Sequence, residues 1–153
     1  MLKTSGVFVL NKDPQSWTPT LTGFGTASPV QFQWVREGKF LVAYGYFTSG
    51  TVQGVLASLT LPNGLLVDAS YLPINATSTQ AGQFVGTYGE NLASGAGYMV
   101  VCTATNANLI YFADDYSSAT NDLTPANGNA VTNNGVFTAV YFRVPIASWS
   151  AND

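Results

Sequence analysis

The stretch Lys39–Thr48, KFLVAYGYFT, is the clearest strand in this sequence of 153 residues. Side chains alternate between the two faces of a strand, so the stretch carries two sets of side chains. One set is Phe40, Val42, Tyr44 and Tyr46, and the other is Leu41, Ala43, Gly45 and Phe47. Because both sets are largely apolar, the pattern predicts a central strand that is covered on both sides.

The neighbouring sequence favours an all-β fold. Gln31–Arg36 alternates as a strand should, and Glu37-Gly38 then marks a tight hairpin. Gly and Pro are spread along the whole chain, which is typical of short strands joined by turns. We therefore expect an antiparallel β-sandwich, jelly-roll-like in form. The further candidate strands are Gln53–Leu61, Gln83–Tyr88, Tyr98–Thr105, Leu109–Ala113 and Gly135–Val144.

The first 30 residues differ from the rest. They are thin in large apolar residues, contain three of the seven prolines, and hold one short candidate strand at Val7–Leu10. We expect an extended N-terminal arm over residues 1–30 and a single β-sandwich domain over residues 31–153.

Charge excludes several functions. Charged residues make up 8% of the chain, against about 25% in an average domain, and the net charge is −3. The surface must then be covered by neutral polar groups or buried against other copies of the chain. The basic residues form no patch for nucleic acid, and no apolar run is long enough to cross a membrane. Cys102 is the single cysteine, so no disulfide can form within the chain.

The chain has no histidine, which removes Ser-His-Asp, Cys-His and histidine-based zinc sites. We expect no enzyme activity and no cofactor. Asp114, Asp115 and Asp122 could bind Ca²⁺ or act as a carboxylate pair, but a solvated loop is the favoured interpretation. An inert buried thiol is favoured for Cys102.

Aromatic residues are the most informative side chains that remain. Tyrosine and tryptophan combine an apolar ring with a polar tip, which suits subunit interfaces and sugar stacking. Core packing is the default for those within strands. The predicted interface or ligand-facing aromatics are Trp17, Tyr116 and Trp149.

Six short motifs follow one another along the chain: Ser16–Thr20 (SWTPT), Gly23–Gly25 (GFG), Gln33–Val42 (QWVREGKFLV), Phe47–Thr51 (FTSGT), Leu59–Leu65 (LTLPNGL) and Val144–Ser150 (VPIASWS). In this order they resemble a family of small β domains from bacteriophage virion surface proteins. The resemblance covers residues 16–150, and it implies a trimeric, jelly-roll-like domain that serves as a capsid decoration protein, head spike or fibre tip.

The choice among those uses rests on chain architecture. The sequence starts at Met1 and contains no stalk, so we expect a homotrimeric capsid decoration (cement) protein on the virion surface, synthesised in the host cytoplasm. Its arm would add a strand to the major capsid protein through Val7, Phe8, Val9 and Leu10. A fibre or spike tip that binds a host surface glycan is the alternative. A carbohydrate-active or carbohydrate-binding module is a third hypothesis.

Overall fold

The computed structural model describes residues 13–72, 83–91, 95–101, 107–114 and 123–151. Within these ranges the chain is almost entirely β, and every strand pairing is antiparallel, which confirms the predicted fold class. The strands are β1 (Gln15–Trp17), β2 (Leu21–Thr22), β3 (Val30–Glu37), β4 (Phe40–Thr48), β5 (Ser58–Thr60), β6 (Gln83–Glu90), β7 (Ala96–Val101), β8 (Leu109–Asp114) and β9 (Phe137–Pro145). The helical turns are η1 (Pro62–Gly64), η2 (Ala69–Tyr71) and α1 (Gly128–Val131).

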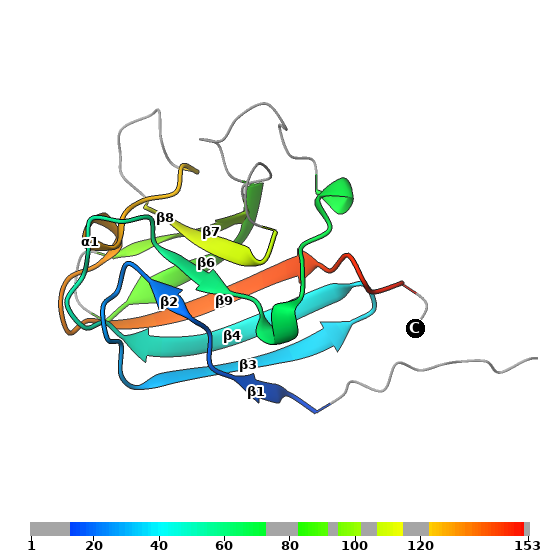
Figure 1. Cartoon of the computed structure of the whole chain (residues 1–153), viewed down its shortest axis with the longest axis horizontal. Helices are drawn as coiled ribbons and strands as arrows, with labels where there is room; N and C mark the ends of the chain where they lie inside the picture. Colours follow the sequence, from blue (N-terminus) through cyan, green and yellow to red (C-terminus); the bar gives the residue numbers. More distant parts are fainter. Residues whose placement is uncertain (1–12, 73–82, 92–94, 102–106, 115–122, 152–153) are drawn as a thin grey trace, which may run out of the picture.

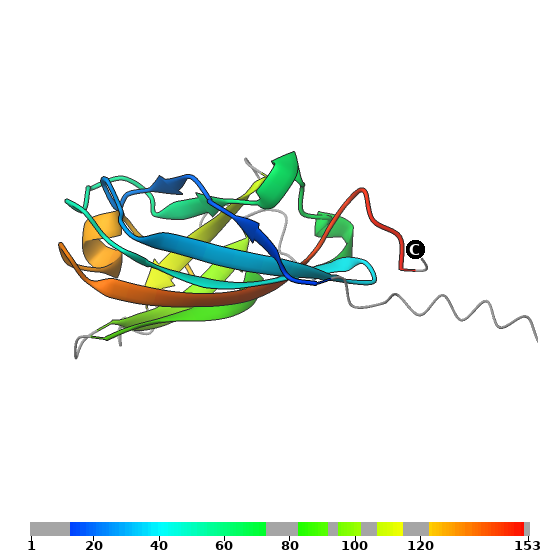
Figure 2. The same cartoon turned by 90° about the horizontal axis from the view of Figure 1, so that it is seen from below.

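The two layers of the fold come from one sheet that curls over on itself. Its order is β1-β3-β4-β9-β6-β7-β8-β5-β2, so the first two strands of the chain lie at its opposite edges (Figure 1). The connection through residues 18–20 joins these edges, and Trp17 Nε1 donates a hydrogen bond to the Thr60 carbonyl at 3.3 Å. Figure 2 shows the curl, with β2 and β5 lying across the interior from β9 and β6.

The hairpin between β3 and β4 forms where the sequence predicts it, with its loop one residue later than the expected Glu37-Gly38. Glu37 pairs with Phe40, which leaves Gly38 and Lys39 as a two-residue loop. Gly38 has φ +56°, a conformation that glycine adopts without the steric cost of a side chain. Strand β4 then pairs with β3 on one side and β9 on the other, so it is central.

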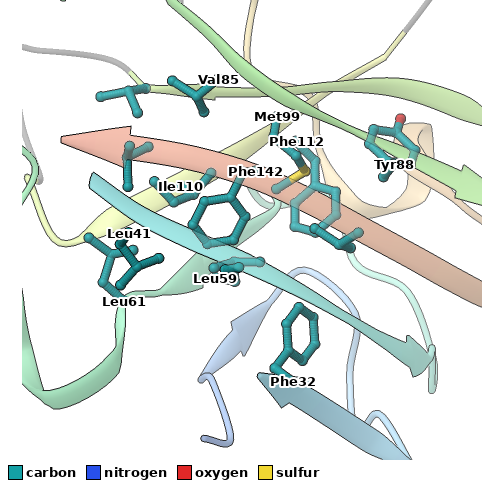
Figure 3. Close-up of a cluster of buried hydrophobic side chains, with 14 of the residues drawn as sticks. Phe32, Leu41, Leu59, Leu61, Val85, Tyr88, Met99, Ile110, Phe112 and Phe142 are labelled. Atoms are coloured by element: carbon teal, nitrogen blue, oxygen red, sulfur yellow. The ribbon is translucent and has the colours of Figure 1, made fainter. Parts of the chain in front are cut away.

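The interior of the curl is an apolar core. Figure 3 shows side chains from β3 through β9 meeting there, with Phe142 of β9 near Phe112 of β8 and Leu41 of β4. Phe142, Phe112 and Leu41 are all fully buried. Burial of this apolar surface is the main favourable contribution to folding.

Gly45 marks a close contact between β3 and β4 in this core. It pairs with Phe32, and a Cβ at position 45 would lie 2.5 Å from that ring. The Phe32 ring therefore lies over the glycine and meets Trp17 edge-on at 5.1 Å. The glycine inside the Tyr44-Gly45-Tyr46 sequence is thus a packing requirement of the inner face.

Part of the expected N-terminal arm belongs to the domain. Residues 13–30 contribute β1 and β2, and Phe24 is fully buried against Phe47 and Phe112. The prediction of an arm up to residue 30 is wrong for this part, because one well-placed phenylalanine can join a core that the segment's composition does not suggest. Residues 1–12 lie outside the described residues.

Strand lengths differ from the predictions in one further place. Of the stretch Gln53–Leu61, only Ser58–Thr60 forms a strand. Val55 and Leu56 are exposed, and Leu56 makes only an isolated bridge to Asn127. None of the helices in the described ranges has the length and apolar character needed to span a membrane.

Candidate binding surface

The two faces of β4 have different environments. Leu41, Ala43 and Phe47 point into the core and are fully buried. On the opposite face, which we call the outer face, Tyr44 is 40% exposed, and Phe40 and Tyr46 are half-buried. Val42 on the same face is buried, so the prediction that β4 is covered on both sides holds only in part for the single chain.

A row of uncharged polar side chains crosses the outer face. Strand pairing places these residues in register over six strands, because residues that face each other in an antiparallel pair share one face. Hydroxyl and amide groups can both donate and accept hydrogen bonds without carrying charge. The row consists of Ser16, Gln33, Tyr44, Tyr141, Thr87 and Tyr98.

Two glutamine–tyrosine pairs stand side by side on β3 and β4. The Tyr44 hydroxyl donates to Gln33 Oε1 at 3.0 Å, and the Tyr46 hydroxyl donates to Gln31 Oε1 at 2.8 Å. The Tyr46 ring also packs on Phe137 of β9 with centroids 5.0 Å apart. These contacts hold both tyrosines in one orientation.

A hollow of about 480 Å³ lies beside these pairs. Its lining comes from β1 and the residue after it, from β3 and from β4, and it contains no charged side chain. Its volume falls within the range of sites that bind small molecules, about 300–1,000 Å³. The lining residues are Ser16, Trp17, Thr18, Val30, Gln31, Phe32, Gln33, Tyr44, Gly45 and Tyr46.

Exposed aromatic rings continue the outer face beyond β9. Tyr141 on β9 is 49% exposed and Phe84 on β6 is 47% exposed. Phe84 meets Tyr98 of β7 edge-on at 5.8 Å. We call Phe84, Tyr98 and Tyr141 the aromatic patch. Exposed rings on adjacent strands of one face are typical of protein interfaces.

One charged pair lies at the hairpin end of the outer face. Arg143 Nε is 3.5 Å from Glu37 Oε2, and the Arg143 guanidinium lies 3.6 Å from the centre of the Phe40 ring. Both charged side chains are about half exposed, so this pair contributes little to stability. The remainder of the face described above is neutral.

Lys39 forms a second charged group, on the hairpin loop. Its Nζ lies 2.8 Å from Asp68 Oδ2 and donates to the Trp149 carbonyl at 3.0 Å. The hydrogen bond from Lys39 lowers the pKa of Asp68, and hydrogen bonds from Ser70 lower it further. These contacts fasten the segment around η2 and the segment after β9 to the hairpin, so the group has a structural role.

The predicted site residues are distributed unevenly. Trp17 is among the residues that line the hollow, although its indole N–H donates a hydrogen bond to the Thr60 carbonyl. Trp149 is half-buried and stacks on Trp34 at 5.8 Å, with Arg36 4.9 Å from its ring centre. Trp149 thus packs on one side within the chain, and it also lines a small pocket with Trp34 and Arg36.

Other predicted site residues fall outside the described residues. These are the anchoring residues Val7, Phe8, Val9 and Leu10, together with Tyr116, Cys102, Asp115 and Asp122. Asp114 ends β8, and its side chain is likewise outside the description. Within the described ranges, no three His, Cys, Asp or Glu residues come together as a metal site.

No known family, curated protein or solved structure matches this chain. The functional argument therefore rests on the side chains of the outer face and on the resemblance of the short motifs.

Sequence reasoning missed the residues that form this surface. The sequence places Gln31, Gln33, Tyr44 and Tyr141 in strands, where core packing is the default interpretation for the tyrosines. The available signal was the alternation of Gln31 and Gln33 with Phe32 and Trp34, which marks one face of β3 as polar in its first half. Extending that face across β4 by register would have placed Tyr44 and Tyr46 on it.

Proposed function

We propose that this chain is a structural protein of a bacteriophage virion surface, a homotrimer that decorates the capsid and has no catalytic role. The observation that carries the assembly part is the outer face. Phe84 and Tyr141 are about half exposed there, and among the described residues of this face Glu37 and Arg143 are the charged ones. Burying such rings against another copy gains apolar contact without leaving a charge unpaired.

The sequence motifs support the phage part of the proposal. Several of them meet in space: Trp17 contacts Thr60, and Trp149 stacks on Trp34. Lys39 donates to the Ile146 carbonyl at 3.4 Å. Contacts that hold the ends of strands together help to specify a fold. The resemblance therefore supports the same architecture for this chain and the phage domains. The use on a capsid is then inferred from that architecture by analogy.

The assembly is tested by sedimentation equilibrium at micromolar concentration. The expected mass is three times the 16.2 kDa of one chain, as a closed cyclic assembly requires. Ala139→Glu places a charge on the outer face of β9 and should shift the protein to monomer. Ala130→Glu makes the same change at an exposed position on α1 and should leave the trimer intact. A wild-type chain that is monomeric would refute the proposal.

Attachment to the capsid needs a separate experiment. Deleting residues 2–12 should weaken binding to capsids that lack this protein, because the sequence predicts an apolar anchoring strand at Val7–Leu10. Circular dichroism and oligomeric state should not change. Equal decoration by the truncated and the complete chain would exclude the arm as the anchor.

A receptor-binding tip of a fibre or spike is the second candidate. The hollow beside Gln33 and Tyr44 favours it, since a decoration protein has no need of a small-molecule site. Localisation by electron microscopy separates the two, because a decoration protein covers the head and a tip lies at the end of a tail fibre or spike.

A further inference from the structure

The hollow on the outer face has the chemistry of a ligand site rather than of a subunit contact. It lies on the β1–β3–β4 part of that face and borders the aromatic patch on β6, β7 and β9, because Tyr44 pairs with Tyr141 of that patch. Tyr44 is 40% exposed at its edge. A concave site with fixed polar groups is typical of small-molecule binding, whereas contacts between proteins are flatter.

The polar groups in the hollow are arranged as donors. Gln31 and Gln33 each accept a tyrosine hydroxyl hydrogen through the amide oxygen. Each amide therefore has its two N–H groups left to direct elsewhere, and within the described residues no protein acceptor takes them. The hydroxyls of Tyr44 and Tyr46 can in turn accept hydrogen bonds. The hollow thus offers paired donors and acceptors that are held in place before a ligand arrives.

Charge limits which ligands fit. A phosphate, sulfate or carboxylate needs a cation or a set of backbone donors, and no Lys or Arg lines the hollow. A purely apolar ligand would cover the glutamine amides without replacing their hydrogen bonds to water, which costs free energy. A ligand with many neutral hydroxyls and apolar ring faces meets both limits.

We propose that this hollow binds an uncharged oligosaccharide, with Gln31 and Gln33 donating to its hydroxyl groups and the rings of Tyr44 and Tyr46 contacting its C–H faces. Tyrosine rings combine an apolar body with a hydroxyl, which suits a sugar that has both kinds of surface. The proposal does not depend on the trimer, because all four residues belong to one chain. The two ideas therefore fail separately.

The test is calorimetric titration of the full chain with maltotriose, cellotriose and chitotriose, with trigalacturonate as the charged comparison. At least one neutral trisaccharide should bind with a Kd of about 1 mM or tighter. Trigalacturonate should bind at least about tenfold more weakly. If none of the neutral sugars binds, or if the charged sugar binds as well as they do, the proposal is overturned.

Variants locate the binding. Tyr44→Ala and Gln33→Ala should each weaken binding about tenfold, the loss expected when a residue central to an interface is truncated. Gln53→Ala changes an exposed glutamine outside the hollow and should leave the affinity unchanged. Tyr44→Phe keeps the ring and removes the hydroxyl that orients Gln33, so it should fall between wild type and Tyr44→Ala. Binding that survives both Tyr44→Ala and Gln33→Ala would place the sugar elsewhere and exclude this site.

Discussion

Tyr141 and Phe142 are neighbours on β9, and they lie on opposite faces of the same sheet. Phe142 is fully buried in the core, whereas Tyr141 is 49% exposed on the outer face. Both faces of β4 and β9 carry aromatic residues, so the presence of an aromatic ring alone does not distinguish them. The difference is in the companions of each ring: Phe142 meets aliphatic and aromatic side chains, and Tyr141 stands in a row of hydroxyl and amide groups. On β4 and β9, one face packs into the main core and the other keeps exposed rings. Farther along the outer face, Val100, Tyr111 and Ala113 form a second buried cluster.

The largest effect is expected on the inner face. Phe142→Ala should reduce the free energy of unfolding by about 3–5 kcal/mol, because it removes a large ring from a closed core and leaves a cavity. Chemical denaturation followed by circular dichroism measures this loss. A loss below about 1 kcal/mol would mean that the interior is not packed around this ring.

Truncating the preceding residue, Tyr141, should not disturb the fold but should weaken the assembly. Tyr141→Ala removes a half-exposed ring, so the circular dichroism spectrum should be unchanged. The dissociation of the trimer should become easier by about tenfold, or about 1.4 kcal/mol, as for a residue central to an interface. Sedimentation at a series of protein concentrations gives this shift. If the assembly is unaffected, the aromatic patch is not the contact between copies.

The sequence specified more about the inner face than about the outer one. Alternation in Lys39–Thr48 located the central strand, and the Glu37-Gly38 turn located its hairpin, because both depend on neighbouring residues only. The register between β4 and β9 depends on residues almost a hundred positions apart. The row from Ser16 to Tyr98 exists only after this long-range pairing, so local sequence could not show it.

Phe24 and Trp149 show the same limit. Phe24 sits in a stretch rich in Gly, Ser, Thr and Pro, yet it reaches the core because the chain turns inward between Gly23 (φ +90°) and Gly25 (φ +60°). Trp149 lies near the end of the sequence and is predicted to face an interface or a ligand. It stacks on Trp34, a partner that only the three-dimensional path of the chain brings close.

A smaller effect on stability is expected from the ion pair between Lys39, in the β3–β4 hairpin loop, and Asp68. The hydrogen bond from Lys39 lowers the pKa of Asp68 below its ordinary value of 3.8, so the folded state favours the carboxylate. This stabilisation is present above the pKa of the unfolded chain and is lost as the pH falls through the lowered folded value. Asp68→Asn should therefore be less stable than wild type at neutral pH.

Acid titration of stability provides the measurement. The difference between wild type and Asp68→Asn in the free energy of unfolding should be constant above about pH 5 and shrink steadily below about pH 4. Ser70→Ala removes a weaker partner of the same carboxylate and should give a smaller difference with the same pH dependence. A difference that stays constant down to the lowest pH would show that the charge of Asp68 does not contribute to the stability of the fold.

The smallest effect is expected from the charged pair on the outer face. Glu37 and Arg143 are about half exposed and 3.5 Å apart, and exposed pairs contribute only about 0–1 kcal/mol. Glu37→Gln should therefore change the stability of the fold by less than about 0.5 kcal/mol, since Arg143 still lies against the Phe40 ring.

Salt should have little effect on the assembly, because screening acts on charges and the other described residues of the outer face are neutral. Raising the ionic strength from about 0.01 M to about 1 M shortens the screening length from about 30 Å to about 3 Å, yet the trimer should dissociate no more readily. Sedimentation of wild type and Glu37→Gln at both salt concentrations tests this. A trimer that falls apart in salt would show that its contacts are ionic and would separate it from the neutral, aromatic outer face.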